Sequence, residues 1–166
     1  MATAQISAEF TGNCQSLIVI LTRHTLNTKF DLELKHVSTT TTYYGQVNTK
    51  DHNSHSFMNL SLEGVYELKV KDMQGVVQDL RYLVSTCAVD KCLVLLTDKL
   101  LSCGCTSPKC SAILDKAQKV MLLLKSATST ASRIIRENVD EVLIEDAQAQ
   151  YRKAVELCGG NCDCGC

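Results

Sequence analysis

The sequence predicts an α+β fold, in which an N-terminal antiparallel β-sandwich of the immunoglobulin-like type precedes a C-terminal α-helical hairpin or bundle. Two observations lead to this prediction. Up to about residue 85, apolar and polar residues alternate, which is the period of strands with one buried face. After residue 86, apolar residues recur every three or four positions, which is the period of amphipathic helices. We therefore expect a sandwich domain over residues 1–86 and a helical domain with a cysteine-rich tail over residues 87–166.

Several segments of the N-terminal half carry strand patterning. Residues 17–21 are apolar at every position, as is typical of a strand at the centre of a sheet. Residues 30–36 alternate between apolar and charged side chains, which predicts a half-exposed strand. Residues 65–71 alternate in the same way and are followed, after a turn, by the extended run 76–84. We expect these two runs to form a hairpin in which Gly75 has a positive φ.

The segment 38–59 departs from this pattern because it is almost entirely polar. It begins with a serine and four threonines, and it contains Tyr43 and Tyr44 and later the cluster 51–55. This composition predicts a long loop or a mobile edge hairpin around a short strand at the tyrosines. With it, the sandwich would have six or seven strands.

Three helices are predicted in the C-terminal half, at about residues 90–102, 108–127 and 132–158. The second begins with Ser107 as its N-cap and Pro108 at its first helical position. The apolar stripes expected to face the core are Val89, Leu93, Leu96, Leu100 and Leu101 in the first helix, Cys110, Ile113, Leu114, Ala117, Val120, Met121 and Leu124 in the second, and Ile135, Val139, Val142, Leu143, Ala147, Tyr151, Ala154 and Leu157 in the third.

The net charge and the length of the first apolar run argue against binding to nucleic acid and to membranes. Seventeen Lys and Arg residues against eighteen Asp and Glu residues give a net charge of −1, so no excess of basic residues points to nucleic acid, and we expect no direct sequence-specific nucleic-acid contact. The first apolar run, at residues 17–21, is too short for a signal peptide or a membrane span. We therefore expect no membrane contact and synthesis in a reducing cytosol.

Cysteine is unusually abundant, with ten residues, nine of them after residue 86. The strongest candidate site is a structural zinc site, since clustered thiolates on short glycine-containing segments are typical zinc ligands. Antiparallel packing of the last two helices would return Cys158 to the turn at residues 103–110. Long-range disulfides and free thiols remain open alternatives. The candidate metal ligands are Cys103, Cys105, Cys110, Cys158, Cys162, Cys164 and Cys166.

The other three cysteines and the histidines point to no chemistry. Cys87 and Cys92 are expected to be buried core residues, and Cys14 a packing residue or a surface thiol. A cysteine nucleophile needs a nearby base, yet all four histidines precede residue 56 and lie far along the chain from the cysteine-rich half. No glycine-rich phosphate loop or nucleophile motif occurs, so we expect no enzyme. The histidines are His24, His36, His52 and His55, and the last two are expected on a solvated loop beside Asp51.

The segments 63–75, 85–93 and 99–105 together resemble small virion proteins of tailed bacteriophages, especially those of crAss-like phages. The first contains the sequence Glu-Gly-Val-Tyr-Glu-Leu-Lys-Val-Lys-Asp, the second Ser-Thr-Cys and Lys-Cys-Leu, and the third Lys-Leu-Leu-Ser-Cys-Gly-Cys. In such proteins a strand-rich domain precedes a cysteine-bearing helical hairpin. The resemblance does not extend to residues 38–59.

This resemblance implies a non-enzymatic structural subunit of the virion neck or tail, made in the host cytoplasm and assembled as a ring in the head-to-tail connector beneath the portal. The implied partners are copies of the chain itself and other virion proteins, such as portal or tail proteins, and no catalytic residues are implied. The alternative is a cytosolic metal-binding or thiol-redox adaptor whose function resides in the C-terminal cysteine cluster. Self-association favours the first function, and a monomer that readily exchanges metal favours the second.

Overall fold

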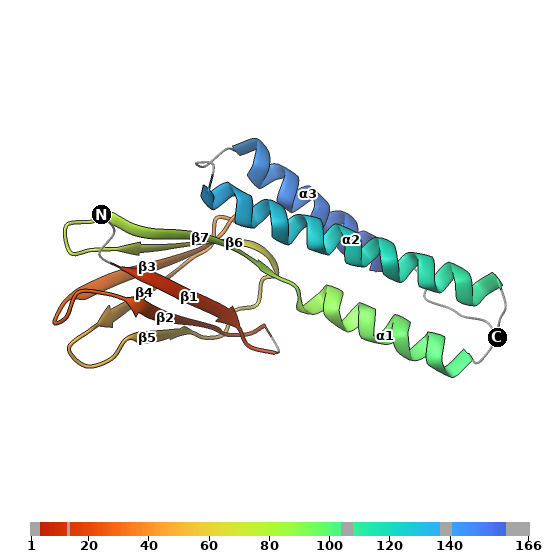
Figure 1. Cartoon of the computed structure of the whole chain (residues 1–166), viewed down its shortest axis with the longest axis horizontal. Helices are drawn as coiled ribbons and strands as arrows, with labels where there is room; N and C mark the ends of the chain where they lie inside the picture. Colours follow the sequence, from red (N-terminus) through yellow and green to blue (C-terminus); the bar gives the residue numbers. More distant parts are fainter. Residues whose placement is uncertain (1–3, 13, 104–107, 137–140, 159–166) are drawn as a thin grey trace. The chain divides into compact units, whose positions relative to one another are not determined.

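The computed structural model describes residues 4–12, 14–103, 108–136 and 141–158. The chain divides into two compact units, Met1–Ser85 and Thr86–Cys166, which we describe separately. The first unit is built of strands and the second of helices (Figure 1), which confirms the predicted α+β class with an N-terminal sandwich.

Seven strands of the first unit form two antiparallel sheets. The three-stranded sheet has the order β1-β2-β5, and the four-stranded sheet has the order β4-β3-β6-β7. Each strand therefore pairs only with antiparallel neighbours, as in an immunoglobulin-like sandwich. The strands are β1 (Gln5–Phe10), β2 (Leu17–Arg23), β3 (Lys29–His36), β4 (Thr42–Asn48), β5 (Ser54–Phe57), β6 (Gly64–Lys71) and β7 (Val77–Ser85).

The core of the sandwich comes from alternate residues of both sheets, as the period of two predicts. In β2 the two sets of apolar residues differ, because Leu17 and Val19 are fully buried whereas Ile18 and Ile20 remain 40% exposed. Gly75 has the predicted positive φ, 80°, in the turn between β6 and β7. The other fully buried members of the core include Ala4, Phe30, Leu34, Val47, Tyr66, Leu68 and Val70.

Two features of this unit differ from the sequence prediction. The polar segment 38–59 contains the predicted strand at Tyr43 and Tyr44, which is the edge strand β4, but the segment is not a hairpin of its own, because β4 pairs with β3 and β5 belongs to the other sheet. Val47 and Phe57 hold these strands in place with their buried side chains, which outweigh the polar residues around them. The first strand, β1, was not predicted, because only two of its six residues, Ile6 and Phe10, are large and apolar.

Tyr66 anchors the start of β6. Its ring is fully buried, and its hydroxyl donates a hydrogen bond of 2.6 Å to the carbonyl of Leu62, four residues earlier. This is the tyrosine corner of immunoglobulin-like sandwiches, in which a tyrosine near the start of the sixth strand fixes the preceding connection. Burial raises the pKa of Tyr66, so the hydroxyl remains a donor throughout the neutral range.

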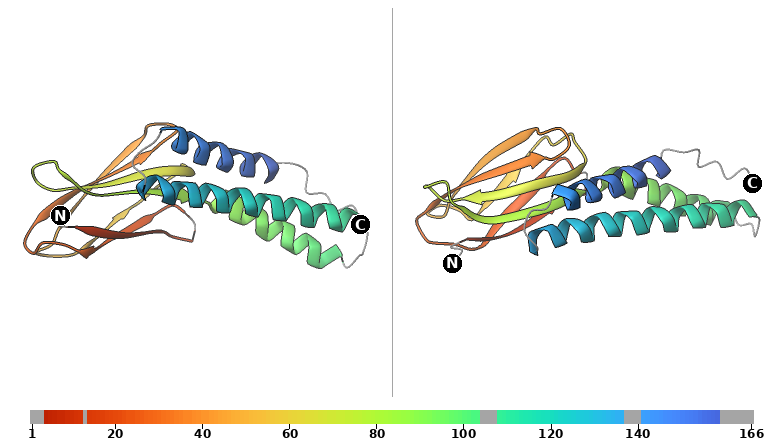
Figure 2. Two further views of the ribbon diagram at one scale, coloured as in Figure 1. Left: turned by 45° about the horizontal axis from the view of Figure 1, so that its top comes forward. Right: turned by 90° about the horizontal axis from the view of Figure 1, so that it is seen from above.

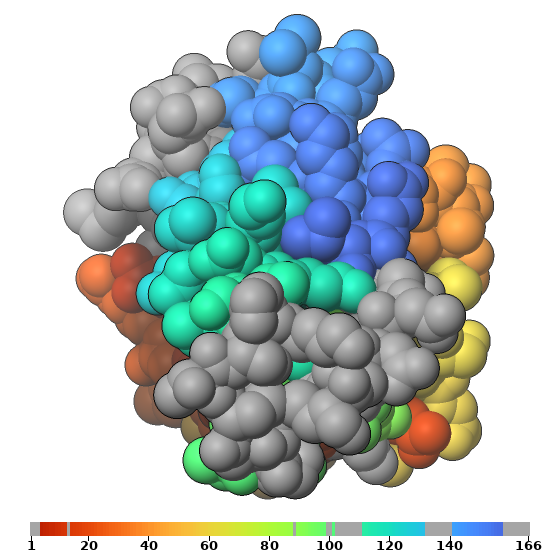
Figure 3. Space-filling model, turned by 90° about the vertical axis from the view of Figure 1, so that its right-hand side faces the viewer, coloured from red at the N-terminus to blue at the C-terminus, as the bar shows by residue number. Residues whose placement is uncertain are grey.

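The second unit contains α1 (Cys87–Cys103), α2 (Pro108–Arg136) and α3 (Glu141–Cys158). Thr86 lies directly before α1, where its carbonyl accepts from the backbone N–H of Asp90 and its hydroxyl donates to the Asp90 carboxylate at 2.7 Å. Helix α2 runs back along α1, and α3 runs back along α2 (Figures 1 and 2). Helices α2 and α3 lie against each other over much of their length (Figure 3).

The helix boundaries differ from those predicted. Helix α2 continues through residues 126–132, where a bend was expected, and α3 begins only at Glu141 rather than at about residue 132. Ala127 and Ala131 are buried there, and the Thr128 hydroxyl donates to the Leu124 carbonyl at 3.0 Å, so small and polar residues are accommodated within the helix.

The predicted apolar stripes are only partly correct. Their centres, including Val89, Leu96, Val120 and Ala147, are buried. Several residues at the sides of the stripes are instead exposed, because each predicted stripe is wider than the face that the neighbouring helices cover. These exposed residues are Leu101, Leu114, Met121 and Val142.

Candidate functional site

The predicted cysteine site falls largely outside the described residues. Cys105, Cys162, Cys164 and Cys166 are not among them. The backbone places the other three candidates at helix ends. Cys103 is the last residue of α1, Cys110 lies in the first turn of α2, and Cys158 is the last residue of α3, whereas the side chains of these three also lie outside the described part.

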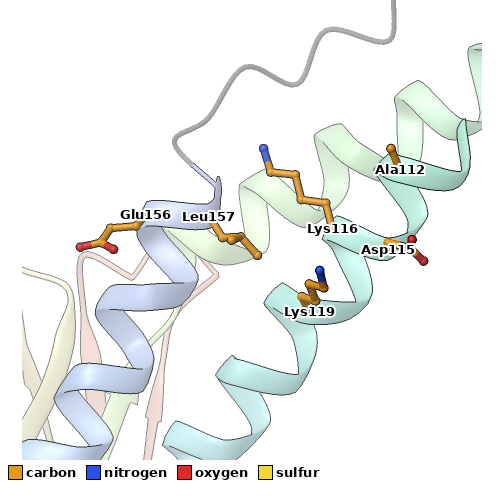
Figure 4. Close-up of a pocket in the computed structure, with 6 residues that line it drawn as sticks. All are labelled: Ala112, Asp115, Lys116, Lys119, Glu156 and Leu157. Carbon is orange, nitrogen blue, oxygen red and sulfur yellow. The ribbon is translucent and has the colours of Figure 1, made fainter. Parts of the chain in front are cut away.

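A pocket at this end of the helical unit shows how the helix ends meet. It has a volume of about 470 Å³ and lies between α2 and α3 (Figure 4). Leu157, the residue before Cys158, lines it together with Ala112, two residues after Cys110. The end of α3 therefore lies beside the first turns of α2, which is the antiparallel return that a shared cysteine site requires.

The side chains of this pocket balance in charge. Lys116 and Lys119 of α2 supply two cations, and Asp115 and Glu156 supply two carboxylates. Leu157 points toward α2, whereas Glu156 points away from it (Figure 4). The formal charge of the lining is zero, so the pocket does not select an anion or a cation by net charge.

Within the described part of the chain, no three His, Cys, Asp or Glu side chains lie close enough together to hold a metal ion. The candidate ligands lie outside the side chains covered by that search. The zinc site at the seven cysteines therefore stays a prediction.

Two cysteines differ from their predicted state. Cys14 and Cys87 are each disulfide-bonded and buried, whereas the sequence led us to expect thiols that serve only packing. That expectation came from the inferred reducing compartment, and cysteine spacing does not show which residues form disulfides. Cys92 is buried, as predicted.

The buried imidazole of His36 holds the corner of the four-stranded sheet. Its Nε2 lies 2.7 Å from the carbonyl oxygen of Glu63, and its Nδ1 lies 2.8 Å from the hydroxyl of Thr39. The ring also packs edge-on against Tyr66, with the ring centroids 5.0 Å apart. Both nitrogens are thus engaged within the fold, and His36 has a structural role.

His55 is not on a solvated loop, as was predicted, but in β5, where it is half-buried. Its ring packs edge-on against Phe57 at 4.8 Å and lies against Gly45 of β4. A side chain at position 45 would overlap this ring, so the glycine makes room for the histidine. Burial, and to a smaller extent His52, lowers the pKa of His55. His52 itself is exposed, as expected.

Charged and polar side chains on the face of the four-stranded sheet that points away from the sandwich core pair across strands. Lys71 Nζ donates to Glu33 Oε2 at 2.8 Å, and this hydrogen bond lowers the pKa of Glu33 and raises that of Lys71. The Tyr82 hydroxyl donates to Glu67 at 2.7 Å, and burial together with this bond raises the pKa of Tyr82. These pairs join neighbouring strands of one sheet, which is a structural arrangement.

Comparisons with known proteins identify no family. No protein-family model and no curated protein matches the sequence. Among solved structures, the chain is similar to one described as "Myokine structure", with 11% identity, a TM-score of 0.39, and coverage of 51% of this chain and 96% of the other. It is also similar to the FN1–FN3 domains of chicken CNTN1, with 12% identity, a TM-score of 0.38, and coverage of 49% and 29%.

A third solved structure, a family 76 glycoside hydrolase from a bovine Bacteroides thetaiotaomicron strain, has 8% identity and a TM-score of 0.43 and covers 94% of this chain and 39% of its own. The chain thus spans less than half of the CNTN1 and hydrolase chains. No helix in the described part of the chain is long and apolar enough to span a membrane.

Proposed function

We propose that this chain is a non-enzymatic structural subunit of a bacteriophage virion, which forms or joins a ring in the head-to-tail connector or tail. The resemblance of the segments 63–75, 85–93 and 99–105 to small virion proteins of crAss-like phages supports this role. The architecture is compatible with it, because a sandwich with open sheet edges and a helical unit provide surfaces for neighbouring subunits.

The observation that carries the proposal is the set of exposed apolar residues on α1. Val89 and Leu96 lie on one side of the helix and are fully buried. Val94 and Leu101 lie about 140° around the axis at 3.6 residues per turn and are 59% and 78% exposed. Large apolar side chains exposed close together on a helix mark a surface that can bind another protein. The exposed side of α1 therefore suits contact with another protein.

The histidines are compatible with a structural role. His36 bonds to the carbonyl of Glu63, and the ring of His55 packs against Phe57. Their contacts are accounted for by packing and by hydrogen bonds within the sandwich.

The test combines protein identification in purified phage particles with native mass spectrometry of the isolated chain. We expect to identify the chain in the particles, and we expect the isolated chain to be an oligomer rather than a monomer. The double substitution Val94→Lys and Leu101→Lys should weaken association, whereas Ser129→Lys, which adds a charge at an exposed polar position of α2, should not. A chain that stays monomeric at high concentration and is absent from particles would overturn the proposal.

The alternative function, a cytosolic metal-binding or thiol-redox adaptor, has one observation in its favour. The pocket formed by Ala112 and Leu157 places the helix ends that carry Cys110 and Cys158 side by side. The same native spectra distinguish the two functions. A monomer that binds zinc and loses it rapidly to a chelator would support the adaptor, whereas an oligomer supports the structural subunit.

A further inference from the structure

We propose that β4 is the strand through which a second copy of this chain docks, in a two-fold antiparallel pair centred on Gly45. This inference rests on the proposed structural function, because it names the surface and the partner of self-association. It follows from the hydrogen bonding, charge and symmetry of β4.

In the described part of the chain, one side of the β4 backbone bonds to β3, and no strand pairs with its other side. In the β3–β4 ladder, the residue numbers of two opposite partners always sum to 77. The backbone hydrogen bonds that flank this ladder join residue 36 to residue 41 and residue 49 to residue 28. Because hydrogen-bonded pairs alternate in an antiparallel ladder, Tyr43, Gly45 and Val47 bond to β3. Tyr44 and Gln46 therefore direct their backbone N–H and C=O groups away from the sheet.

The other sheet edges are better protected against pairing than β4. Position 6 at the β1 edge already donates its N–H to the Asp79 carboxylate at 3.0 Å, and β7 carries both Asp79 and Arg81. Strand β5 has only four residues. Strand β4 has seven residues, Thr-Tyr-Tyr-Gly-Gln-Val-Asn, with no charge and no proline. Charges, proline and short length are the usual protections of an edge, so β4 is the edge most open to a further strand.

The sequence of β4 fits a copy of itself. In an antiparallel pair centred on Gly45, Tyr44 lies opposite Gln46 of the second copy, and the two residues can exchange both hydrogen bonds. Tyr43 lies opposite Val47 of the second copy, an aromatic and β-branched pair that stabilises strand pairing. The pair brings no like charges together. The ladder ends at Asn48, whose carbonyl already accepts from the N–H groups of Asp51 and His52.

The register also accounts for the exposure of Tyr44. Its side chain is 76% exposed, although it is aromatic and lies in the middle of a strand. In the proposed pair the two copies of Tyr44 are diagonal neighbours on the same face, within the reach of aromatic side chains. The two four-stranded sheets would then join into one sheet of 4 + 4 strands. A two-fold pair closes on itself, so a ring would need another contact, such as the exposed side of α1.

The central experiment compares Gln46→Pro with Gln46→Ala by measuring the dimer dissociation constant of the whole chain by analytical ultracentrifugation. The N–H of Gln46 points away from β3, so proline removes a donor to the second copy without removing a β3 bond. It deletes two of the four central intermolecular bonds, one in each copy. We expect Gln46→Pro to weaken dimerisation by about tenfold or more, and Gln46→Ala, which keeps the donor, to change it by less than about threefold.

A second pair of variants keeps the test decisive if the proline variant does not fold. Tyr44→Lys would place two positive charges diagonally across the pair and should also weaken dimerisation. Met73→Lys is the matched control, because Met73 is 58% exposed in the β6–β7 turn of the same unit. A photo-cross-linking phenylalanine analogue at position 44 should join two copies through peptides from residues 42–48.

The outcomes separate this inference from the proposed function. Dimers that persist in Gln46→Pro and Tyr44→Lys, or cross-links to peptides outside 42–48, would overturn β4 pairing even if the chain is found in particles. A monomeric wild-type chain would overturn it as well. Loss of dimerisation in both variants, with Gln46→Ala and Met73→Lys unchanged, would support it even if the chain is absent from particles.

Discussion

The imidazole of His55 occupies the space that any side chain at position 45 would need. A Cβ built on Gly45 would overlap the imidazole, and on its other side the ring packs edge-on against Phe57. A polar residue thus acts as a packing element, and only its neutral form suits this half-buried position. Burial lowers the pKa of His55 for this reason.

This lowered pKa predicts a pH dependence of stability. The unfolded chain binds a proton at His55 near pH 6.5, whereas the folded chain binds it only at lower pH. The stability that the neutral His55 contributes is therefore complete above about pH 6.5, and it is lost as the pH falls through the pKa of His55 in the folded chain. We expect His55→Gln to reduce the loss of unfolding free energy between about pH 7 and pH 5, measured by urea denaturation. A pH profile of His55→Gln identical to that of the wild type would contradict this prediction.

The Tyr66 hydroxyl supports a second prediction. Tyr66→Phe keeps the buried ring and deletes the donor of the 2.6 Å bond to the Leu62 carbonyl. We expect a loss of about 1–2 kcal/mol in unfolding free energy, from the lost bond and the carbonyl left without this donor. Tyr44→Phe removes the same hydroxyl from a residue that is 76% exposed and should change stability by less than about 0.5 kcal/mol. Equal effects of the two substitutions in urea denaturation would contradict a tyrosine corner.

The sequence patterns predicted which residues are buried better than they predicted which hydrogen bonds form. The alternation in 65–71 correctly placed Tyr66, Leu68 and Val70 on one buried face. It could not show that the Tyr66 hydroxyl returns to Leu62, although a tyrosine near the start of the sixth strand of a predicted sandwich was an available signal. No sequence pattern indicated that Gly45 makes room for a side chain, because this role depends on the His55 ring from a strand of the other sheet.

At the level of elements, the strongly periodic segments were predicted, whereas in the polar segment 38–59 only the strand at Tyr43 and Tyr44 was. Strands β2, β3, β6 and β7 all coincide with the predicted runs to within a few residues. Strand β5, Ser-His-Ser-Phe, has little intrinsic strand preference, and its position depends on pairing with β2. In α2, the segment 126–132 remains helical because small residues such as Ala127 and Ala131 are buried in the bundle. Tertiary packing overrides local propensity in both places.

The contact between β4 and β5 gives a prediction at this scale. Gly45→Ala should destabilise the sandwich by about 1–3 kcal/mol, because the added methyl group displaces the His55 ring. In a His55→Ala background the same change should cost less, since the space is then empty. The double-mutant cycle, measured by chemical denaturation, should give a coupling energy of about 1 kcal/mol or more. Additive effects would show that Gly45 serves the β4 backbone alone rather than the contact with His55.

On the scale of the whole molecule, nine of the ten cysteines divide into two groups, and the tenth, Cys92, is buried in α1. Cys14 and Cys87 are disulfide-bonded and buried, so they belong to the folded core of their units. The remaining candidates cluster at the ends of helices or outside the described residues, at Cys103, Cys110 and Cys158 among others. Cysteine spacing predicts that the second group forms a cluster, but disulfide bonding of the first group depends on the tertiary fold and could not be derived from spacing.

Thiol alkylation read by mass spectrometry tests this division. In urea without reductant, Cys14 and Cys87 should stay unmodified and become reactive only after reduction, which we expect to lower stability by about 2–4 kcal/mol. The variant Cys14→Ser with Cys87→Ser should show no such dependence on reductant. Modification of both residues in urea before reduction would contradict the disulfides.

The cysteine cluster responds differently if it holds zinc. Thiolates bound to zinc are shielded from alkylation in the folded chain and are released by a chelator, without any reductant. The end of α3 lies beside the start of α2, as Leu157 and Ala112 show, so the zinc site predicts that a chelator makes Cys110 and Cys158 reactive together. Removal of the metal should also lower the melting temperature of the helical unit, because zinc binding contributes to folding. If these cysteines react fully before any chelator or reductant is added, both the zinc site and long-range disulfides are wrong, and the cluster consists of free thiols.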